Sequence, residues 1–324
     1  GLIDPHEHLT GGSGEEGYAS RSPEIQLTEI TTSGITTVVG CLGTDAVTRT
    51  LEGLLAKVKG LAEEGLTAYM YTGSYDLPVV TLAGSIRRDI LLIAEVIGVG
   101  EIAISDHRSA QPDPIALERL VIDARTAGSL ASKAGVTHFH VGEEKERLAP
   151  LRALLETGRI EPAALYATHV QRTSELLVEA AGISRQGCYV DMDTTEEELG
   201  PAVSGFREAG GDLERLTVSS DADSGSPSRI WSQMRAAIRN GHLPLEQALR
   251  LATRNTARVL HLETKGVLEP GRDADLLVLD AGSLEIRDVV AGGRFLVRDR
   301  QPVKGEKFLP DSRRHFEIHG GKSG

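Results

Sequence analysis

The chain has 324 residues, 40% of them hydrophobic, and its 47 acidic and 35 basic residues give a formal net charge of −12. This length suffices for one domain of barrel size with a small appendage. The acidic balance argues against a surface that binds nucleic acid or an anionic membrane, and no stretch reaches the roughly 18 apolar residues of a membrane span.

The two cysteines, Cys41 and Cys188, each lie in an apolar run of strand type. We therefore expect buried free thiols in a reducing, cytoplasmic setting. Neither thiol has a base beside it in the sequence, so neither is expected to be a catalytic nucleophile. The chain begins without Met inside a strand-like motif, from which we expect a further segment before Gly1.

The first residues, Gly-Leu-Ile-Asp-Pro-His-Glu-His, place His6 and His8 directly after an apolar lead-in. Residues two apart on a strand point the same way, so both imidazoles can face one point. Convergent imidazoles are typical ligands of a divalent metal ion. A His-x-His alone is weak evidence, and its meaning depends on whether later strands add ligands.

Apolar runs of strand type then alternate with helical patterns up to residue 240. The expected strands cover residues 2–4, 35–40, 66–72, 96–105, 136–142, 165–170, 188–193 and 216–220. The expected helices cover residues 24–32, 46–64, 115–127, 144–156, 174–181, 196–209 and 229–240. Pro23 is expected in the first turn of the first helix, and Gly34 and Gly210 where helices stop.

Val-rich and Ile-rich strands without strict alternation indicate burial on both faces, as in a parallel sheet. Eight such units in succession predict a closed (β/α)₈ barrel of TIM type. An open doubly wound sheet is the alternative, and it is disfavoured because no Gly-x-Gly-x-x-Gly follows the first strand.

A last helical pattern covers residues 244–260, and a different organisation follows it. Short apolar runs at 276–279, 286–290 and 295–297 are separated by turn residues, which predicts a small β-domain of sandwich type. We therefore divide the chain into a barrel, residues 1–262, and a β-domain with a loosely held tail, residues 263–324.

In such a barrel the reacting groups lie at the C-terminal ends of the strands. Polar residues recur at those ends in strands 1, 4, 5, 6 and 8, and four histidines and two carboxylates would meet at one mouth. Such a set could hold two metal ions, and it consists of His6, His8, Glu101, His140, His169 and Asp221. His138 and His107, which neighbour these positions, are expected to support the site.

With these motifs in view, the sequence resembles the bacterial isoaspartyl (β-aspartyl) dipeptidases of the amidohydrolase superfamily. The resemblance spans nearly the whole chain, and members of the family carry a further N-terminal segment that completes the small β-domain. It also implies a homo-oligomer, often an octamer. The segments that carry it are 1–23, 40–45, 72–78, 104–110, 139–142, 168–172, 219–221 and 271–279.

The resemblance implies that His6, His8 and Asp221 bind the more buried of two metal ions, and that His140 and His169 bind the more exposed one. The bridging position, commonly a carbamylated Lys in this family, aligns with Glu101 after a one-residue insertion. A glutamate supplies the same carboxylate without carbon dioxide. The alternative is that Glu101 only lines the mouth and leaves a looser or single-metal site. Zinc is the expected metal, because the coordination is rich in imidazole.

A metal-bridging hydroxide would attack the scissile carbonyl in such a site. Asp221 would take the proton and pass it to the leaving amine, and by resemblance Tyr75 donates a hydrogen bond to the oxyanion. The alternatives are that Asp221 is only a metal ligand and that Tyr75 packs at the barrel rim.

The resemblance also assigns the binding of a small dipeptide. Glu15 pairs with its amine, and Arg108 and Arg172 hold the carboxylate of the leaving residue, for which a planar guanidinium is suited. Thr44 and the backbone near Ser13 hold the aspartyl carboxylate. A serine soon after Asp221 assists in the family; the alignment falls on Gly225, and Ser224 beside it is the candidate.

Three functions stay open at this point. The first is an isoaspartyl dipeptidase, and the second is another amidohydrolase, such as a cyclic-amide hydrolase or an N-acyl-amino-acid deacylase. The joint presence of Glu15, Tyr75, Arg108 and Arg172 favours the first, because a cyclic amide offers no second carboxylate. The third is a scaffold without chemistry, against which the histidines and Asp221 speak.

Overall fold

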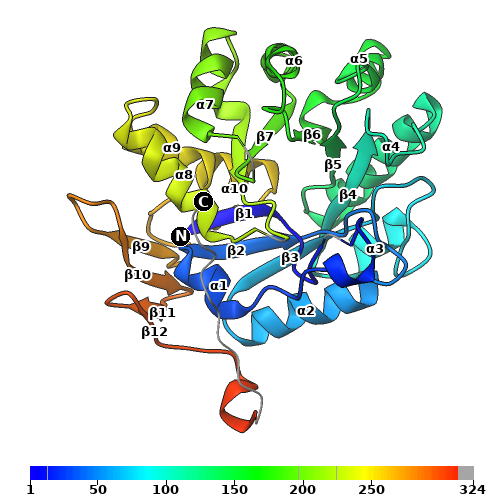
Figure 1. Ribbon diagram of the computed structural model, residues 1–324. Helices are drawn as coiled ribbons and strands as arrows, with labels where there is room; N and C mark the ends of the chain where they lie inside the picture. The colour runs from blue at the N-terminus through cyan, green and yellow to red at the C-terminus, as the bar shows by residue number, and fades with distance from the viewer. Residues whose placement is uncertain (13, 196, 224, 313–324) are drawn as a thin grey trace.

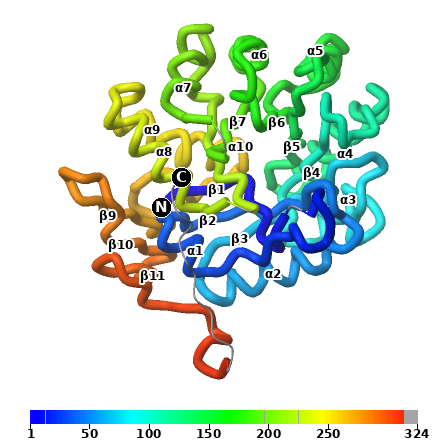
Figure 2. The backbone as a smooth tube through the Cα atoms, viewed as in Figure 1, coloured from blue at the N-terminus to red at the C-terminus, as the bar shows by residue number. Residues whose placement is uncertain are grey.

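The computed structural model describes residues 1–12, 14–195, 197–223 and 225–312. Within this part of the chain, eight parallel strands follow one another in sequence order around a barrel (Figures 1 and 2). They are β1 (Leu2–Glu7), β2 (Ile35–Gly40), β3 (Thr67–Thr72), β4 (Val96–Ile104), β5 (Val136–Val141), β6 (Leu165–Thr168), β7 (Tyr189–Asp193) and β8 (Leu216–Ser219).

The barrel closes between its first and last strands through backbone hydrogen bonds. Asp221 N donates to His6 O at 3.1 Å, and His8 N donates to Ala222 O at 3.0 Å. The predicted (β/α)₈ barrel is thereby confirmed, and the ends of β1 and β8 are brought together.

Helices cover the outside of the barrel, with apolar faces turned to the strands. In α2, for example, Leu51, Leu54, Val58 and Leu61 are buried at helical spacing. The helices are α1 (Leu27–Thr32), α2 (Leu51–Glu63), α3 (Ile86–Leu92), α4 (Pro114–Ala131), α5 (Ala149–Glu156), α6 (Ser174–Arg185), α7 (Leu199–Glu208), α8 (Ser228–Arg239), α9 (Leu245–Leu251) and α10 (Arg254–Val259).

Helices α3 and α1 differ from the prediction, and α5 begins at Ala149, five residues later than expected. Helix α3 has seven residues, too few for a clear period, and the sequence pattern did not indicate it. The first helix begins at Leu27, so the placement of Pro23 in its first turn was wrong; a capping box between Gln26 and Glu29 starts the helix instead. Gly34 and Gly210 do follow helices, with φ of 85° and 77°.

The helix expected at residues 244–260 is divided into α9 and α10. At the break, the carbonyl of Ala252 accepts a hydrogen bond from Ile3 N of β1 at 2.8 Å. That carbonyl is no longer available to the helix, and Thr253 leaves helical geometry with φ of −135° and ψ of −88°. A contact with the far end of the chain therefore ends a pattern that looked continuous.

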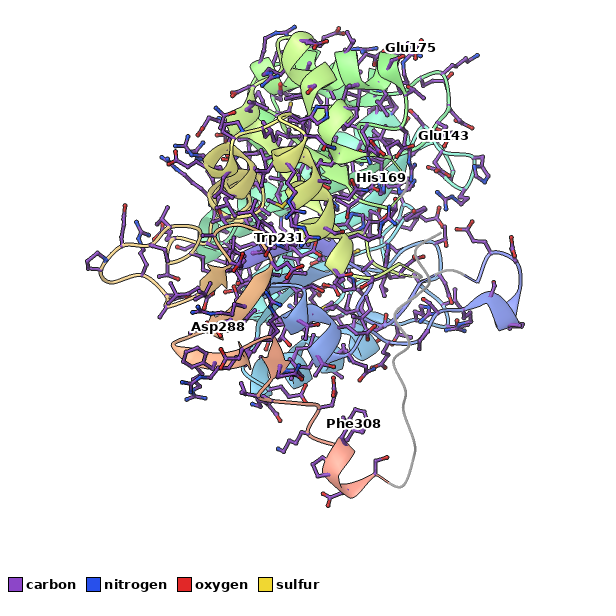
Figure 3. The ribbon with its side chains drawn as sticks, turned by 60° about the vertical axis from the view of Figure 1, so that its left-hand side comes forward. Glu143, His169, Glu175, Trp231, Asp288 and Phe308 are labelled. Carbon is purple, nitrogen blue, oxygen red and sulfur yellow. The ribbon has the colours of Figure 1, made fainter. Side chains whose placement is uncertain are left out.

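The small β-domain packs beside the barrel as one antiparallel sheet in the order β12-β11-β10-β9 (Figure 1). Trp231 of α8 reaches this sheet (Figure 3), and its indole N–H donates to the carbonyl of Leu284 at 2.9 Å. The division of domains after residue 262 stays a prediction, and residues 313–324 of the tail lie outside the described residues. The strands are β9 (Leu276–Leu279), β10 (Ile286–Ala291), β11 (Arg294–Arg298) and β12 (Gln301–Pro302).

The sheet packs against the start of β2, at the end of the barrel opposite the candidate site. A Cβ added at Gly34, just before β2, would lie 2.8 Å from Ile286 Cδ1.

Among the described residues, no helix combines the length and the apolar character that a membrane crossing requires.

The interior of the barrel changes from apolar to polar along the strands. Toward the strand starts, Ile3, Ile97 and Val136 belong to a buried apolar cluster with neighbouring tyrosines. Toward the C-terminal ends, the inward side chains are histidines and carboxylates. The apolar layer closes the lower end of the barrel, so the polar layer opens only at its mouth.

Candidate metal centre and active site

Four imidazoles meet at the C-terminal ends of β1, β5 and β6. The ring centroids of His6 and His8 lie 5.4 Å apart, those of His140 and His169 lie 4.5 Å apart, and 5.5 Å separates His6 from His169. All four residues are buried, with 8% exposure at most. The strands have brought together residues that are up to 163 positions apart in the chain.

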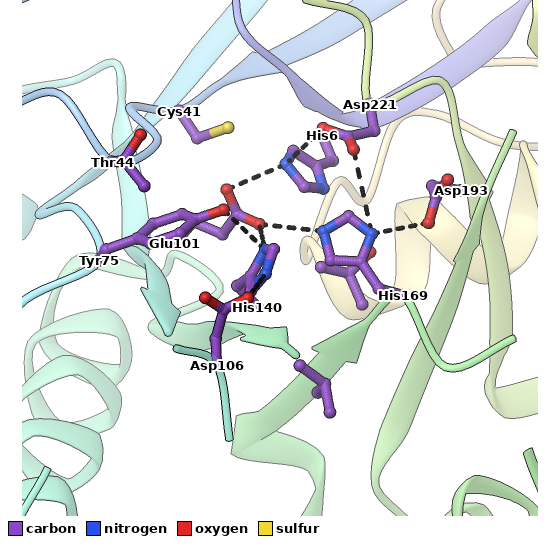
Figure 4. Close-up of polar contacts among 12 residues, drawn as sticks. His6, Cys41, Thr44, Tyr75, Glu101, Asp106, His140, His169, Asp193 and Asp221 are labelled. Carbon is purple, nitrogen blue, oxygen red and sulfur yellow. Dashed lines mark hydrogen bonds and ion pairs between the residues drawn. The ribbon is translucent and has the colours of Figure 1, made fainter. Parts of the chain in front are cut away.

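Glu101 of β4 stands between the two histidine pairs (Figure 4). Its Oε2 lies 3.3 Å from His6 Nε2 and 3.8 Å from His8 Nε2. Its Oε1 lies 2.8 Å from His140 Nδ1 and 3.2 Å from His169 Nε2. One oxygen therefore faces each pair, and the bridging role of Glu101 stays a prediction.

Glu101 is ionised at neutral pH. Full burial would raise the pKa of its carboxyl group, but the imidazoles of His6 and His140 hold that pKa well below its ordinary value. A permanently charged carboxylate in this position suits a cation on either side.

Asp221, directly after β8, approaches the first pair. Its Oδ1 lies 3.2 Å from both His6 Nε2 and His8 Nε2. The backbone is left-handed at Asp221, with φ of 46°, and at His169, with φ of 64°. A left-handed backbone conformation costs of order 1 kcal/mol or more in a residue other than glycine, and such conformations are concentrated at functional sites.

Two aspartates orient the second pair, and the sequence analysis assigned neither of them a role. His140 donates from Nε2 to Asp106 Oδ2 at 2.9 Å, and His169 donates from Nδ1 to Asp193 Oδ2 at 2.6 Å. The opposite nitrogen of each ring is thereby left for Glu101 or a metal ion. Both aspartates come at the end of an expected strand or just after it, which is the signal that would have found them.

The same contacts keep the two aspartates charged. Burial would raise the pKa of Asp106, but hydrogen bonds from Arg108 and His140 hold it well below its ordinary value. His169 lowers the pKa of Asp193 in the same way, against burial. Each imidazole of this pair is therefore polarised by a carboxylate behind it.

The donor atoms fit divalent metal ions. Both ring nitrogens of His6 and Oε2 of Glu101 are buried without a hydrogen-bond partner among the described residues, and such an atom costs about 1–3 kcal/mol if nothing satisfies it. A cation between one of these nitrogens and Oε2 would satisfy those two atoms. Three groups of residues have possible ligand atoms that all lie within 4.8 Å of one another. The first group is His6, His8, Cys41 and Glu101, the second is His6, His169 and Asp221, and the third is Glu101, His140 and His169.

Cys41 is a member of one of these groups, which the sequence did not indicate. Its Sγ lies 3.8 Å from His8 Nδ1. Burial would raise the pKa of the thiol, but His8 and His6 lower it below its ordinary value. The absence of a base beside Cys41 in the sequence was misleading, because the base comes from a neighbouring strand.

His138 lies beneath the centre. Its ring centroid is 4.8 Å from that of His6, and it stacks on Tyr71 at 5.1 Å. Burial lowers the pKa of His138 well below its ordinary value, so the ring is neutral. His107, by contrast, is a rim residue whose side chain is 82% exposed.

A cavity of 590 Å³ opens onto this centre. Its wall includes the residues predicted to bind substrate that the structure describes, together with the exposed sides of His8, His140, His169 and Asp221. Ser13 and Ser224 lie outside the described residues, although Gly12, Gly14 and Gly225 line the cavity. The predicted binding residues on its wall are Glu15, Thr44, Tyr75, Arg108 and Arg172.

The charged residues on this wall contact one another and the centre. Arg108 donates to Glu15 Oε1 at 2.7 Å and to both oxygens of Asp106 at 2.8–2.9 Å. Arg172 donates to the carbonyl of Val141 at 3.0 Å and lies 3.3 Å from His140 Nε2. Glu15, with a side chain 51% exposed, is the outermost member of this set.

Tyr75 lies deeper, with its hydroxyl 2.8 Å from His140 Nδ1 and its ring under the Arg108 guanidinium. Burial and the nearby Glu101 raise its pKa well above the ordinary value. The hydroxyl therefore keeps its proton at neutral pH. Its position against a candidate ligand, and not at the outer rim, is compatible with a donor role.

Arg49, whose role the sequence did not indicate, holds the loop that carries Glu15. Its guanidinium donates to the carbonyls of Gly12 and Ser22 at 2.9 Å each and also to that of Thr10. These contacts hold both ends of the glycine-rich loop, and Glu15 itself contacts Arg108 and Thr44.

The barrel and the paired histidines define a class of protein. A model of the amidohydrolase family matches residues 1–296, and the chain belongs to that family of hydrolytic enzymes.

Within this class, the chain is similar to the β-aspartyl dipeptidase of the thermophilic, keratin-degrading Fervidobacterium islandicum AW-1. One structure of that protein is 44% identical, with a TM-score of 0.90 over 93% of this chain and 83% of the other. A second, in complex with the β-Asp-Leu dipeptide, is 42% identical, with a TM-score of 0.89 over 93% and 85%.

Two imidazolonepropionases are more distant relatives. The one from Ruegeria pomeroyi is 26% identical over 318 residues, which covers 86% of this chain and 78% of the relative. The match to the one from Thermoplasma acidophilum is 49% identical but spans only 53 residues, 16% of this chain and 13% of that relative's length.

Proposed function

We propose that the chain hydrolyses β-aspartyl (isoaspartyl) dipeptides with the aid of two divalent metal ions, with zinc as the expected metal. The observation that carries the proposal is that Glu15, Arg108 and Arg172 line the same cavity as the histidine and carboxylate cluster. A small substrate with a charged group at each end matches this wall. The similarity to a protein solved with β-Asp-Leu supports the same substrate class.

The residues on either side of Glu101 would hold the two ions. On one side, Oε2 of Glu101 faces His6 and His8, and Asp221 contacts the same two imidazoles. On the other side, Oε1 faces His140 and His169. When bound, such ions supply a water nucleophile at neutral pH and polarise the scissile carbonyl.

Asp221 is suited to move the proton of the reaction. Its side chain is 17% exposed and lines the cavity, so it touches both the histidines and the space for the substrate. The carboxylate would take the proton of the attacking water and pass it to the amine that leaves. The buried Tyr75 hydroxyl would donate to the oxygen on which negative charge develops.

The charged wall would favour a dipeptide substrate. Glu15 would pair with the substrate amine, and Arg108 and Arg172 with the carboxylate of the leaving residue. In the structure Glu15 and Arg108 pair with each other at 2.7 Å, so a substrate that carries both charges can replace both halves of this ion pair. Thr44, whose hydroxyl lies 3.4 Å from Glu15, would help at the aspartyl end.

Hydrolysis of β-Asp-Leu and α-Asp-Leu, each with and without a chelator, tests the proposal. We expect cleavage of the β-linked peptide only, loss of activity on chelation and recovery with added Zn²⁺. Cleavage of a cyclic amide or of an N-acyl amino acid, with β-Asp-Leu left intact, would instead support the alternative amidohydrolase activity.

A further inference from the structure

The thiol of Cys41 reaches the metal centre because of how the first two strands pair. Strand β2 runs parallel to β1 with Gly40 opposite Glu7, and Cys41 follows directly. Cys41 N donates to Glu7 O at 3.1 Å, which fixes its backbone at the level of the histidines. In Figure 4 the sulfur is turned toward the side of the centre that holds His6.

The thiol belongs to a compact group of four possible ligand atoms. Those of His6, His8, Cys41 and Glu101 all lie within 4.8 Å of one another, and all four residues are buried. Ligands of a tetrahedral zinc ion stand about 3.3–3.8 Å apart, given bonds of about 2.0–2.3 Å. A small contraction would therefore give two nitrogens, one sulfur and one oxygen around a single ion.

A second observation points to the same place. Both ring nitrogens of His6 and Oε2 of Glu101 lack a hydrogen-bond partner among the described residues, and both side chains are fully buried. Buried polar atoms normally have a partner. A cation near the thiol would provide one for Glu101 Oε2 and for one of the two His6 nitrogens.

We propose that Cys41 is a ligand of the metal ion held by His6 and His8. The inference rests on the proposed function, because it requires that the centre binds metal. On binding, the thiol releases its proton to water and stays a thiolate, with no change of oxidation state. The ion would then have a nitrogen, sulfur and oxygen coordination that favours zinc over magnesium or manganese.

A thiolate ligand also changes the part played by Asp221. Asp221 belongs to a different candidate group, with His6 and His169, and it lines the cavity. Cys41 is 1% exposed and approaches from the β2 side. With the sulfur as the fourth ligand, the carboxylate of Asp221 is left on the substrate side, where it can accept and release the proton.

Cobalt(II) substitution tests the ligand directly. The protein is stripped with a chelator and reloaded with Co²⁺, and its absorption spectrum is compared with those of Cys41→Ser and Cys188→Ser. Cys188 is the matched control, because it is a buried thiol elsewhere in the barrel, just before β7, where burial raises its pKa to about 12. We expect a near-ultraviolet thiolate-to-cobalt band in the wild type and in Cys188→Ser, and its loss in Cys41→Ser.

A measurement on the unaltered protein covers the case in which Cys41→Ser does not fold. X-ray absorption of the zinc-loaded wild type should show a sulfur neighbour at about 2.3 Å. Two zinc ions per chain without a sulfur neighbour, and a cobalt spectrum without the thiolate band, would overturn the inference and leave the proposed function standing. A wild type that binds no zinc would overturn both.

Discussion

The two histidine pairs of the centre are held by different kinds of partner. On the β5 and β6 side, His140 and His169 each donate to a buried aspartate, at 2.9 Å and 2.6 Å. On the β1 side, the sulfur of Cys41 lies 3.8 Å from His8 Nδ1, and neither nitrogen of His6 has a hydrogen-bond partner among the described residues. Glu101 has an oxygen within 3.3 Å of an imidazole on each side, whereas Asp221 lies 3.2 Å from the β1 pair and 3.9 Å from His169.

The difference suggests two ways to orient a ligand. A carboxylate behind an imidazole fixes which nitrogen carries the proton and makes the other a better donor. On the β1 side the orientation comes from the strand, since His6 and His8 are two residues apart and point the same way. We expect the β5 and β6 side to depend on its aspartates and the β1 side to depend on its backbone and on Glu101.

The largest effect is expected for Glu101→Ala, because this change removes the carboxylate that makes the shortest contacts to both sides. We expect loss of metal from both positions and a fall in activity toward β-Asp-Leu of roughly a thousandfold or more. Metal content per chain, measured by mass spectrometry, checks this, with Glu101→Gln as a variant of equal size without the charge. Normal metal content in Glu101→Ala would count against a bridging role.

Tyr75→Phe should separate chemistry from metal binding. Loss of one donor to a developing oxyanion lowers kcat by about 10²–10³-fold, and metal content should stay as in the wild type. Because the hydroxyl lies 2.8 Å from His140 Nδ1, loss of metal in this variant would show that Tyr75 orients the second pair and does not act on the substrate.

Asp193→Asn tests whether the two histidine pairs are held independently of each other. The amide cannot accept the His169 proton as strongly, so the affinity for the ion on the β5 and β6 side should fall by about 10–100-fold. Competition with a chelator of known affinity measures this, and the other ion should be retained. Equal weakening of both ions would mean that the two sides are not independent.

The smallest effect is expected for Arg172→Ala, at the cavity wall. Loss of a hydrogen bond from a charged group to the substrate carboxylate should raise KM about tenfold or more, with little change in kcat or metal content. Arg172→Lys keeps the charge without the planar guanidinium, so its KM should lie between those of the wild type and Arg172→Ala. A fall in kcat with unchanged KM would place Arg172 at the reacting centre, where it lies 3.3 Å from His140.

Local patterns in the sequence were enough to predict the barrel. The alternation of apolar strands with helices determined its class, since this pattern has few packed solutions. The spacing of His6 and His8 and the recurrence of polar residues at strand ends indicated where the ligands would gather. The pattern failed at α3, which is too short to show a period, and at the break between α9 and α10, which a contact from Ile3 imposes.

The partners of those ligands were decided by the tertiary structure alone. Nothing near Cys41 in the sequence points to His8, and nothing near Asp193 points to His169, because each contact joins neighbouring strands that are 24 or more residues apart in the chain. The sequence determined which residue types stand at the ends of the strands. Which atom faces which depends on strand register and barrel closure, and these are set by the packing of the whole chain.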